Sequence, residues 1–217
     1  DRPRPAVQRF EGRTFPFDLG EATTAGLETL ARDEGTTPFA VLLAGYSALL
    51  GRITGLPEVA IGSPVAGRSL AEFEGIVGHF ANPVVLRLDL ADRPTYRRLV
   101  ERAAAVVRSA IERQDYPFGL LVERLQPARD PGRGPLFQAA FYWEQLRTDV
   151  APDGWEVVAA DQRGAETDLV LSVLGGGRSL RAAFRYRTDL FEAGTIERMA
   201  GCFRTLLSAL VEDPDRP

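Results

Sequence analysis

The sequence contains no lysine, and it holds only one residue each of histidine, cysteine, methionine and asparagine. All 26 basic side chains of the 217-residue chain are therefore arginine. The lack of lysine excludes a lysine Schiff base and a phosphate-binding loop built around a lysine. One cysteine and one histidine are too few for a Cys/His zinc site, and a single cysteine excludes an internal disulfide. Any histidine-based proton transfer by this chain must use His79.

The sequence also lacks long apolar runs and an excess of basic over acidic residues. The net charge is −4 and the pI is near 5.2, so nucleic acid is not an expected partner. The most apolar stretch, Phe39 to Leu50, suits a buried helix because it is far shorter than a membrane span. The opening residues, Asp-Arg-Pro-Arg-Pro, do not resemble a signal peptide. A cytoplasmic location is expected, since a single cysteine fits a reducing compartment.

The apolar pattern predicts helices and strands in mixed order. Helices are expected over residues 21–34, 37–53, 95–114, 117–125 and 195–211, where apolar residues recur at helical spacing. Strands are expected within residues 8–19, 59–61, 84–90, 137–143, 168–174 and 180–186, with a glycine-rich hairpin between the last two. The elements do not alternate as regular βαβ units, so the expected class is α/β with an α+β two-layer arrangement and a mixed sheet. Cys202 falls on the apolar side of the last helix and is expected in the core.

The only histidine and the only asparagine lie three residues apart, at the entrance to a predicted strand. In one interpretation, His79 is a general base and Asn82 donates a hydrogen bond to an oxyanion. In the alternative, Asn82 bonds backbone groups at a turn and His79 packs beside Phe80. Spacing by itself favours the alternative.

Two charged loops are further candidates. The first is a turn-rich loop in which the guanidinium of Arg68 can bind a carboxylate or phosphate, although a structural ion pair is the favoured interpretation. Its residues are Gly62, Ser63, Pro64, Val65, Ala66, Gly67 and Arg68. The second contains Arg129, Asp130 and Arg133, for which an Arg–Asp pair that locks the loop is favoured over an anion site. The arginines of the helix over residues 95–114 are interpreted as an exposed charged face rather than a docking site for an acidic partner.

The order of several motifs, and the residues in them, closely resemble the second half of a condensation domain from a nonribosomal peptide synthetase. The motifs are Ile61-Gly-Ser-Pro-Val-Ala-Gly-Arg68, Gly78-His-Phe-Ala-Asn-Pro-Val-Val-Leu-Arg87, Gln114-Asp-Tyr-Pro-Phe118, Arg129-Asp-Pro-Gly-Arg-Gly-Pro-Leu-Phe-Gln138 and Tyr186-Arg-Thr-Asp-Leu-Phe191. They span nearly the whole chain in family-like order. The resemblance implies a lobe of the chloramphenicol-acetyltransferase type, from the superfamily of CoA-dependent acyltransferases.

The resemblance also implies an activity that needs partners. In this family two lobes enclose a tunnel, and each substrate is held as a thioester on the phosphopantetheine arm of a carrier protein. The implied partners are the N-terminal lobe, donor and acceptor carrier proteins and an adjacent adenylation domain, and no cofactor is expected to bind this chain directly. The family's HHxxxDG motif, which carries the catalytic histidine, lies in the N-terminal lobe and is absent here.

Positions carry over from the family one at a time. Residues 1–6 correspond to the linker between the lobes, residues 58–75 to the floor of the tunnel, and residues 146–167 to a latch that crosses onto the other lobe. Asn82, Pro83 and Ser63 are expected on the tunnel wall near the acceptor. Arg129, Asp130, Arg133 and Asp168 are expected to be structural. Pro83 and Thr167 depart from the residues common at these positions, so the substrate class and latch docking are left open.

The expected function is therefore that of a C-terminal lobe in an amide-forming condensation domain, and the isolated chain is expected to be inactive. A first alternative is a non-catalytic, degenerate lobe that docks a carrier protein or another synthetase domain. A second is a small standalone acyltransferase that uses His79, which a His79→Ala substitution would test.

Overall fold

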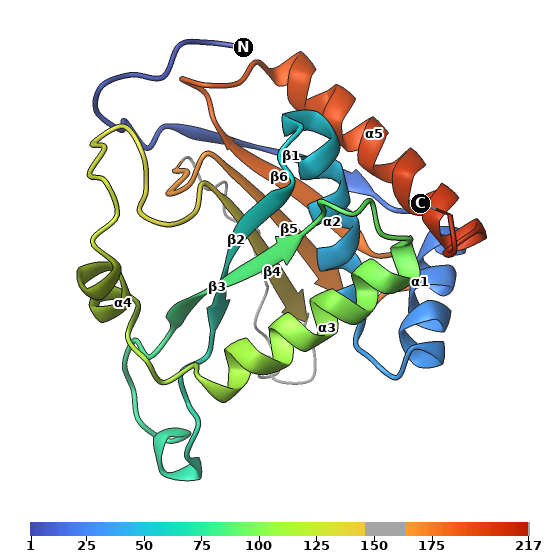
Figure 1. The fold of residues 1–217 in the computed structure, drawn as a ribbon, viewed down its shortest axis with the longest axis horizontal. Helices are drawn as coiled ribbons and strands as arrows, with labels where there is room; N and C mark the ends of the chain where they lie inside the picture. The colour runs from blue at the N-terminus through green and yellow to red at the C-terminus, as the bar shows by residue number, and fades with distance from the viewer. Residues whose placement is uncertain (146–163, 217) are drawn as a thin grey trace, which may run out of the picture.

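The computed structural model describes residues 1–145 and 164–216 and shows a mixed six-stranded sheet with helices layered on one face (Figure 1). The strands are β1 (Gly12–Asp18), β2 (Glu58–Val65), β3 (Asn82–Asp89), β4 (Ala139–Gln145), β5 (Leu169–Gly175) and β6 (Arg181–Arg187). The helices are α1 (Glu21–Asp33), α2 (Pro38–Thr54), η1 (Ala71–Phe73), α3 (Tyr96–Glu112), α4 (Phe118–Leu125) and α5 (Ala193–Glu212). The two-layer prediction is confirmed.

The order of strands across the sheet is β1-β6-β5-β4-β2-β3. The β2–β4 and β4–β5 pairs are parallel, and the other three pairs are antiparallel. The predicted hairpin is β5–β6, which turns through Gly175 to Gly177. Parallel neighbours need long connections, and here these carry α3, α4 and the segment that follows β4.

Helix α2 lies at the centre of the core, because nine of its 17 residues are buried, and eight of these follow one another from Ala40 to Ser47. Its start follows from local sequence, since the Thr37 hydroxyl accepts a hydrogen bond from the Ala40 amide at 3.3 Å and Pro38 occupies the first turn. Helices α2, α3 and α5 pack on the sheet, and α1 packs on α2 and α5. The apolar sheet residues Ile61, Phe141 and Phe184 point into this layer.

Both outer strands carry a proline on the side that faces away from the sheet. In β1, the Thr188 amide bonds the Glu11 carbonyl and the Leu19 amide bonds the Leu180 carbonyl, so the alternate residue Pro16 presents its backbone outward. In β3, the Leu90 amide bonds the Pro57 carbonyl, which by the same alternation turns Pro83 outward. A proline lacks the N–H that another strand would need, so each edge resists further pairing.

Three sequence predictions need correction or qualification. Gly62 to Val65 were expected in a turn-rich loop, but they continue β2, because the β-branched start of β3 pairs with them as far as Val65 and Asn82. Cys202 was expected in the core and is exposed, since the buried stripe of α5 runs through Met199 and Phe203 instead. Residues 1–6 are docked on the body, where Arg2 donates to the Thr188 carbonyl at 2.8 Å.

The latch prediction falls mostly on residues 146–163, which lie outside the described residues. At its end, Gly164 forms an isolated bridge with Glu11, and Ala165 is buried. No single helix in the described part of the chain is long and apolar enough to cross a membrane; the pair α1 and α2 qualifies only jointly, and it is bent by 112°.

Candidate functional site

The sequence-predicted residues meet at the end of the β2–β3 pair, where residues 66–81 leave the sheet as the β2–β3 connection. Val65 pairs with Asn82, Pro64 with Pro83, and Ser63 with Val84. Figure 1 shows this connection projecting from the body at the lower left, with α4 near the same end of the sheet. The cluster therefore includes the floor residues and Asn82 but not the Arg129–Arg133 loop.

Asn82 joins the start of β3 to the α3–α4 connection. Its side-chain amide donates to the Gln114 and Tyr116 carbonyls, each at 2.9 Å, and its carbonyl oxygen accepts from the Phe118 amide at 2.9 Å. Both N–H groups of this side chain are thus in use, which leaves no donor for an oxyanion in this arrangement. The structure shows the backbone-bonding alternative, but the bonded groups lie more than 30 residues away instead of in the local turn.

His79 is exposed on the β2–β3 connection. No hydrogen bond or ion pair of His79 is found within residues 1–145 and 164–216. A catalytic histidine is usually oriented by a second group, and none is in place here.

Arg68 holds the β2–β3 connection together from inside. Its guanidinium donates to the carbonyls of Phe73, Ile76 (2.9 Å) and Gly78 (3.4 Å), and it lies 4.3 Å from the centre of the Phe80 ring. The favoured prediction of an ion pair is wrong, because carbonyl oxygens and an aromatic face take the place of a carboxylate. These contacts also use the guanidinium donors that a bound carboxylate or phosphate would need.

Gly62 and Gly67 are required by close approaches. A Cβ on Gly62 would lie 2.2 Å from the Phe137 ring, and that ring packs on Phe118 of α4 at 5.6 Å between centres. Gly67 has φ +63°, and a Cβ there would lie 1.9 Å from the Phe80 carbonyl oxygen. These contacts explain two of the glycines in the predicted floor motif.

Ser63 is buried and closes the sheet beyond the last β2–β4 pair. Its hydroxyl donates to the Phe141 carbonyl at 2.8 Å, while regular pairing with β4 stops at Gly62 and Ala140. The hydroxyl oxygen keeps a free lone pair, so Ser63 can still accept a hydrogen bond from a ligand.

Asp168 anchors a separate, structural cluster. Arg4 donates to both of its carboxylate oxygens, one of them at 2.9 Å, and the fully buried Arg187 approaches at 3.4 Å. Arg187 also pairs with Asp189 at 2.6 Å, and this bond lowers the pKa of Asp189. Arg4 and Arg187 both donate to the Gly132 carbonyl. The cluster ties the first residues to β5, to β6 and to the 129–136 loop.

The 129–136 loop contains the expected Arg–Asp pair, formed by Arg133 and Asp130 at 3.2 Å. Asp130 also accepts from the Gly132 amide at 2.8 Å, so it shapes the turn that presents the Gly132 carbonyl. Arg129 is exposed and takes no part. Among the α3 arginines, Arg97 and Arg102 are paired with carboxylates, so the predicted exposed charged face is partly neutralised.

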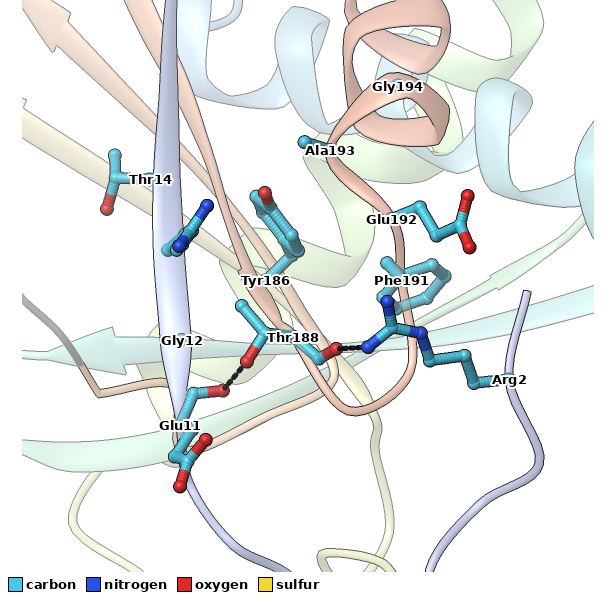
Figure 2. Close-up of a pocket in the computed structure, with 11 residues that line it drawn as sticks. Arg2, Glu11, Gly12, Thr14, Tyr186, Thr188, Phe191, Glu192, Ala193 and Gly194 are labelled. Atoms are coloured by element: carbon cyan, nitrogen blue, oxygen red, sulfur yellow. Dashed lines mark hydrogen bonds between the residues drawn. The ribbon is translucent and has the colours of Figure 1, made fainter.

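A large pocket lies elsewhere, beside β1 and the start of α5, with a volume of about 980 Å³. Figure 2 shows Arg2 bonded to the Thr188 carbonyl and the Thr188 hydroxyl bonded to the Glu11 carbonyl along its floor. Arginine and glutamate side chains line it together, and no sequence-predicted site residue belongs to it. In the part of the chain that the structure describes, no group of three or more His, Cys, Asp or Glu side chains could hold a metal ion.

Comparison with known proteins identifies the family. The sequence model of the condensation domain matches residues 1–217. Phosphinothricin tripeptide synthetase PhsB of Streptomyces viridochromogenes is 42% identical over 100% of this chain and 19% of its own length. Tyrocidine synthase 3 of Brevibacillus parabrevis is 38% identical over 99% of this chain and 3% of its own length. The chain thus spans under a fifth of these relatives.

Solved structures agree. A holo four-domain nonribosomal peptide synthetase bound to AMP and glycine matches 100% of this chain with a TM-score of 0.90 and 29% identity, over 18% of its own length. The X-domain from teicoplanin biosynthesis matches with a TM-score of 0.91 and 26% identity, over 50% of its own length. The chain belongs to the condensation-domain family of nonribosomal peptide synthetases, in which it corresponds to the C-terminal lobe.

Proposed function

We propose that this chain supplies the C-terminal half of a tunnel in which an amide bond joins two carrier-tethered substrates. The acceptor amine attacks the thioester carbonyl of an acyl, aminoacyl or peptidyl donor, the C–S bond breaks, and the donor's phosphopantetheine thiol leaves with a proton. The remaining parts are the N-terminal lobe, two carrier proteins and an adjacent adenylation domain. The pathway is nonribosomal peptide or hybrid polyketide–peptide synthesis.

The β2–β3 connection is the observation that carries this proposal. Arg68 and the Phe73–Phe80 ring pair, with centres 5.7 Å apart, give the connection a defined shape. Its apolar side chains nevertheless face outward, with Leu70 53% and Val77 100% exposed. An ordered projection with apolar side chains at its surface is typical of a segment that packs against another body, which fits a tunnel floor spanning towards a second lobe.

The chain by itself is proposed to be inactive. Asn82 has no free donor, His79 has no orienting partner among the described residues, and the family's catalytic histidine belongs to the other lobe. Loss of a general acid–base group typically costs about 10²- to 10⁴-fold in rate. Asn82 is better described as a positioning residue, because it fixes α4 against the end of β3.

Complementation tests the proposal. The lobe is mixed with a separately expressed N-terminal lobe that carries HHxxxDG, and amide formation between carrier-bound substrates is measured. We expect activity only in the mixture. Leu70→Asp should weaken association of the lobes about tenfold or more, whereas Leu56→Asp, at a similarly exposed site outside the connection, should not. A stable complex without amide formation would contradict the catalytic proposal.

The alternative of a non-catalytic docking module has one observation in its favour. Helix α4 has no buried residue, and its apolar Leu120 and Leu125 are 50% and 58% exposed. A helix with such a surface can dock a carrier protein or a synthetase domain without chemistry. Carrier binding that survives in a complex without transfer activity would favour this alternative, and transfer unaffected by His79→Ala would end the standalone-acyltransferase interpretation.

A further inference from the structure

An apolar crevice opens where the helix layer ends over β2, β3 and β4. Its volume is about 530 Å³, and its wall includes Phe39, Val65, Val84, Ile111 and Trp143. None of the described residues that line it is charged, although 26% of the chain is. Volumes of this order are typical of small-molecule sites.

The crevice adjoins the candidate site through the backbone. Val65 and Val84 in its wall pair with Asn82 and Ser63, respectively, in the β2–β3 ladder. Ser63 lines the crevice, and its hydroxyl donates its hydrogen to the Phe141 carbonyl. A group seated in the crevice would therefore lie beside the strand ends from which the β2–β3 connection departs.

We propose that this crevice holds the apolar side chain of a carrier-bound aminoacyl group and that Trp143, Val84 and Ile111 select for it. The inference rests on the proposed condensation function and names the substrate class. An uncharged wall offers nothing to offset the desolvation of a charged or strongly polar side chain, whereas an aliphatic or aromatic side chain gains by leaving water. Trp143 adds an aromatic face on which a ring can pack.

Direct binding to the chain tests the inference without catalysis. The sequence has two tryptophans, so Trp155→Phe leaves Trp143 as the only tryptophan reporter. Titration with phenylalanine amide should change Trp143 fluorescence saturably. Serine amide should bind at least about tenfold more weakly, since it buries no comparable apolar surface.

A matched pair of variants locates the binding. Ile111→Glu places a charge at the crevice, whereas Ile53→Glu places one at the end of α2 that lies away from Phe39; the two side chains are 51% and 53% exposed. Ile111→Glu should weaken binding of phenylalanine amide at least about tenfold, and Ile53→Glu should leave it unchanged. Exposed positions are chosen so that both variants fold.

A second assay, in the complete domain, distinguishes failure of the crevice assignment from failure of the condensation proposal. In the complemented system, Ile111→Glu should lower the ratio of phenylalanine to serine condensation rates about tenfold, and Ile53→Glu should not. Three results would each overturn the crevice assignment. Phenylalanine amide does not bind saturably, or it binds saturably with an affinity that Ile111→Glu leaves unchanged. The third result is that Ile111→Glu abolishes association of the lobes. If no substrate condenses in any mixture while the titration succeeds, the condensation proposal fails and takes with it the assignment of a carrier-bound aminoacyl group, and the crevice is left as a site for apolar ligands.

Discussion

Asn82 shows how much one side chain can organise in this lobe. Three hydrogen bonds connect the first residue of β3 to both sides of the turn between α3 and α4. The rarity of asparagine in the sequence drew attention to this position, but its partners could not be predicted, since they lie 32 to 36 residues away. The chemistry of a primary amide, with two donors and an acceptor, suits this three-way contact.

Replacement of Asn82 by alanine should lower the free energy of unfolding by about 1–3 kcal/mol, because two carbonyls and one amide lose their partner. The Phe118 amide, which donates to the Asn82 side chain, should exchange its hydrogen faster in the variant. His79→Ala serves as the control, since His79 is exposed, and it should change stability by no more than about 0.5 kcal/mol. Equal effects of the two substitutions in urea unfolding would contradict the positioning role.

At the scale of elements, the β2–β3 connection is a small ordered unit built from local sequence. The prediction recognised its glycines and Arg68 but began the loop too early and gave Arg68 the wrong partner. Strand pairing decides where a strand ends, and β2 extends to Val65 because Val65 pairs with Asn82. The carbonyls bound by Arg68 converge only after the chain has folded back through η1.

Two glycines of this connection make a matched comparison. Gly67→Ala should disrupt the connection, because the left-handed backbone costs about 1–3 kcal/mol for other residues and the new Cβ would collide with the Phe80 carbonyl. Gly75→Ala meets nothing within 4 Å and should be neutral. Limited proteolysis within residues 66–81 should speed up in the first variant only; unchanged cleavage of Gly67→Ala would show that the clash is relieved elsewhere.

At the scale of the whole lobe, a cluster around Arg187, which is 0% exposed, connects segments that are distant in sequence. Arg4, Asp168 and Asp189 bring together the chain start, β5 and the turn after β6, and the Gly132 carbonyl adds the 129–136 loop. The family resemblance implied structural roles for Arg129, Asp130, Arg133 and Asp168, but it gave no sign of Arg4 or Arg187. Arginines are abundant in this sequence, and only the packing shows which one is buried.

This cluster should make the lobe sensitive to acid. The Arg187 bond holds the pKa of Asp189 below its value in the unfolded chain, so the pair contributes fully above about pH 4 and is lost as the pH falls further. Asp189→Asn should cost up to about 3–5 kcal/mol at neutral pH, since it leaves a buried cation poorly paired. It should also flatten the decline in stability below about pH 5 in urea unfolding. A parallel decline in both proteins would contradict this assignment.

The sequence by itself determined most helices and strands, the two-layer class and the family, because periodicity, caps and ordered motifs are local properties. The missing lysine and the single histidine also determined which chemistry this chain cannot supply. Only the tertiary structure decided that the side-chain amide of Asn82 donates to backbone carbonyls and that Arg68 binds carbonyls of its own loop. The same holds for the uncharged crevice beside Ser63. Each depends on groups that are distant in sequence and meet only when the sheet and its helices pack.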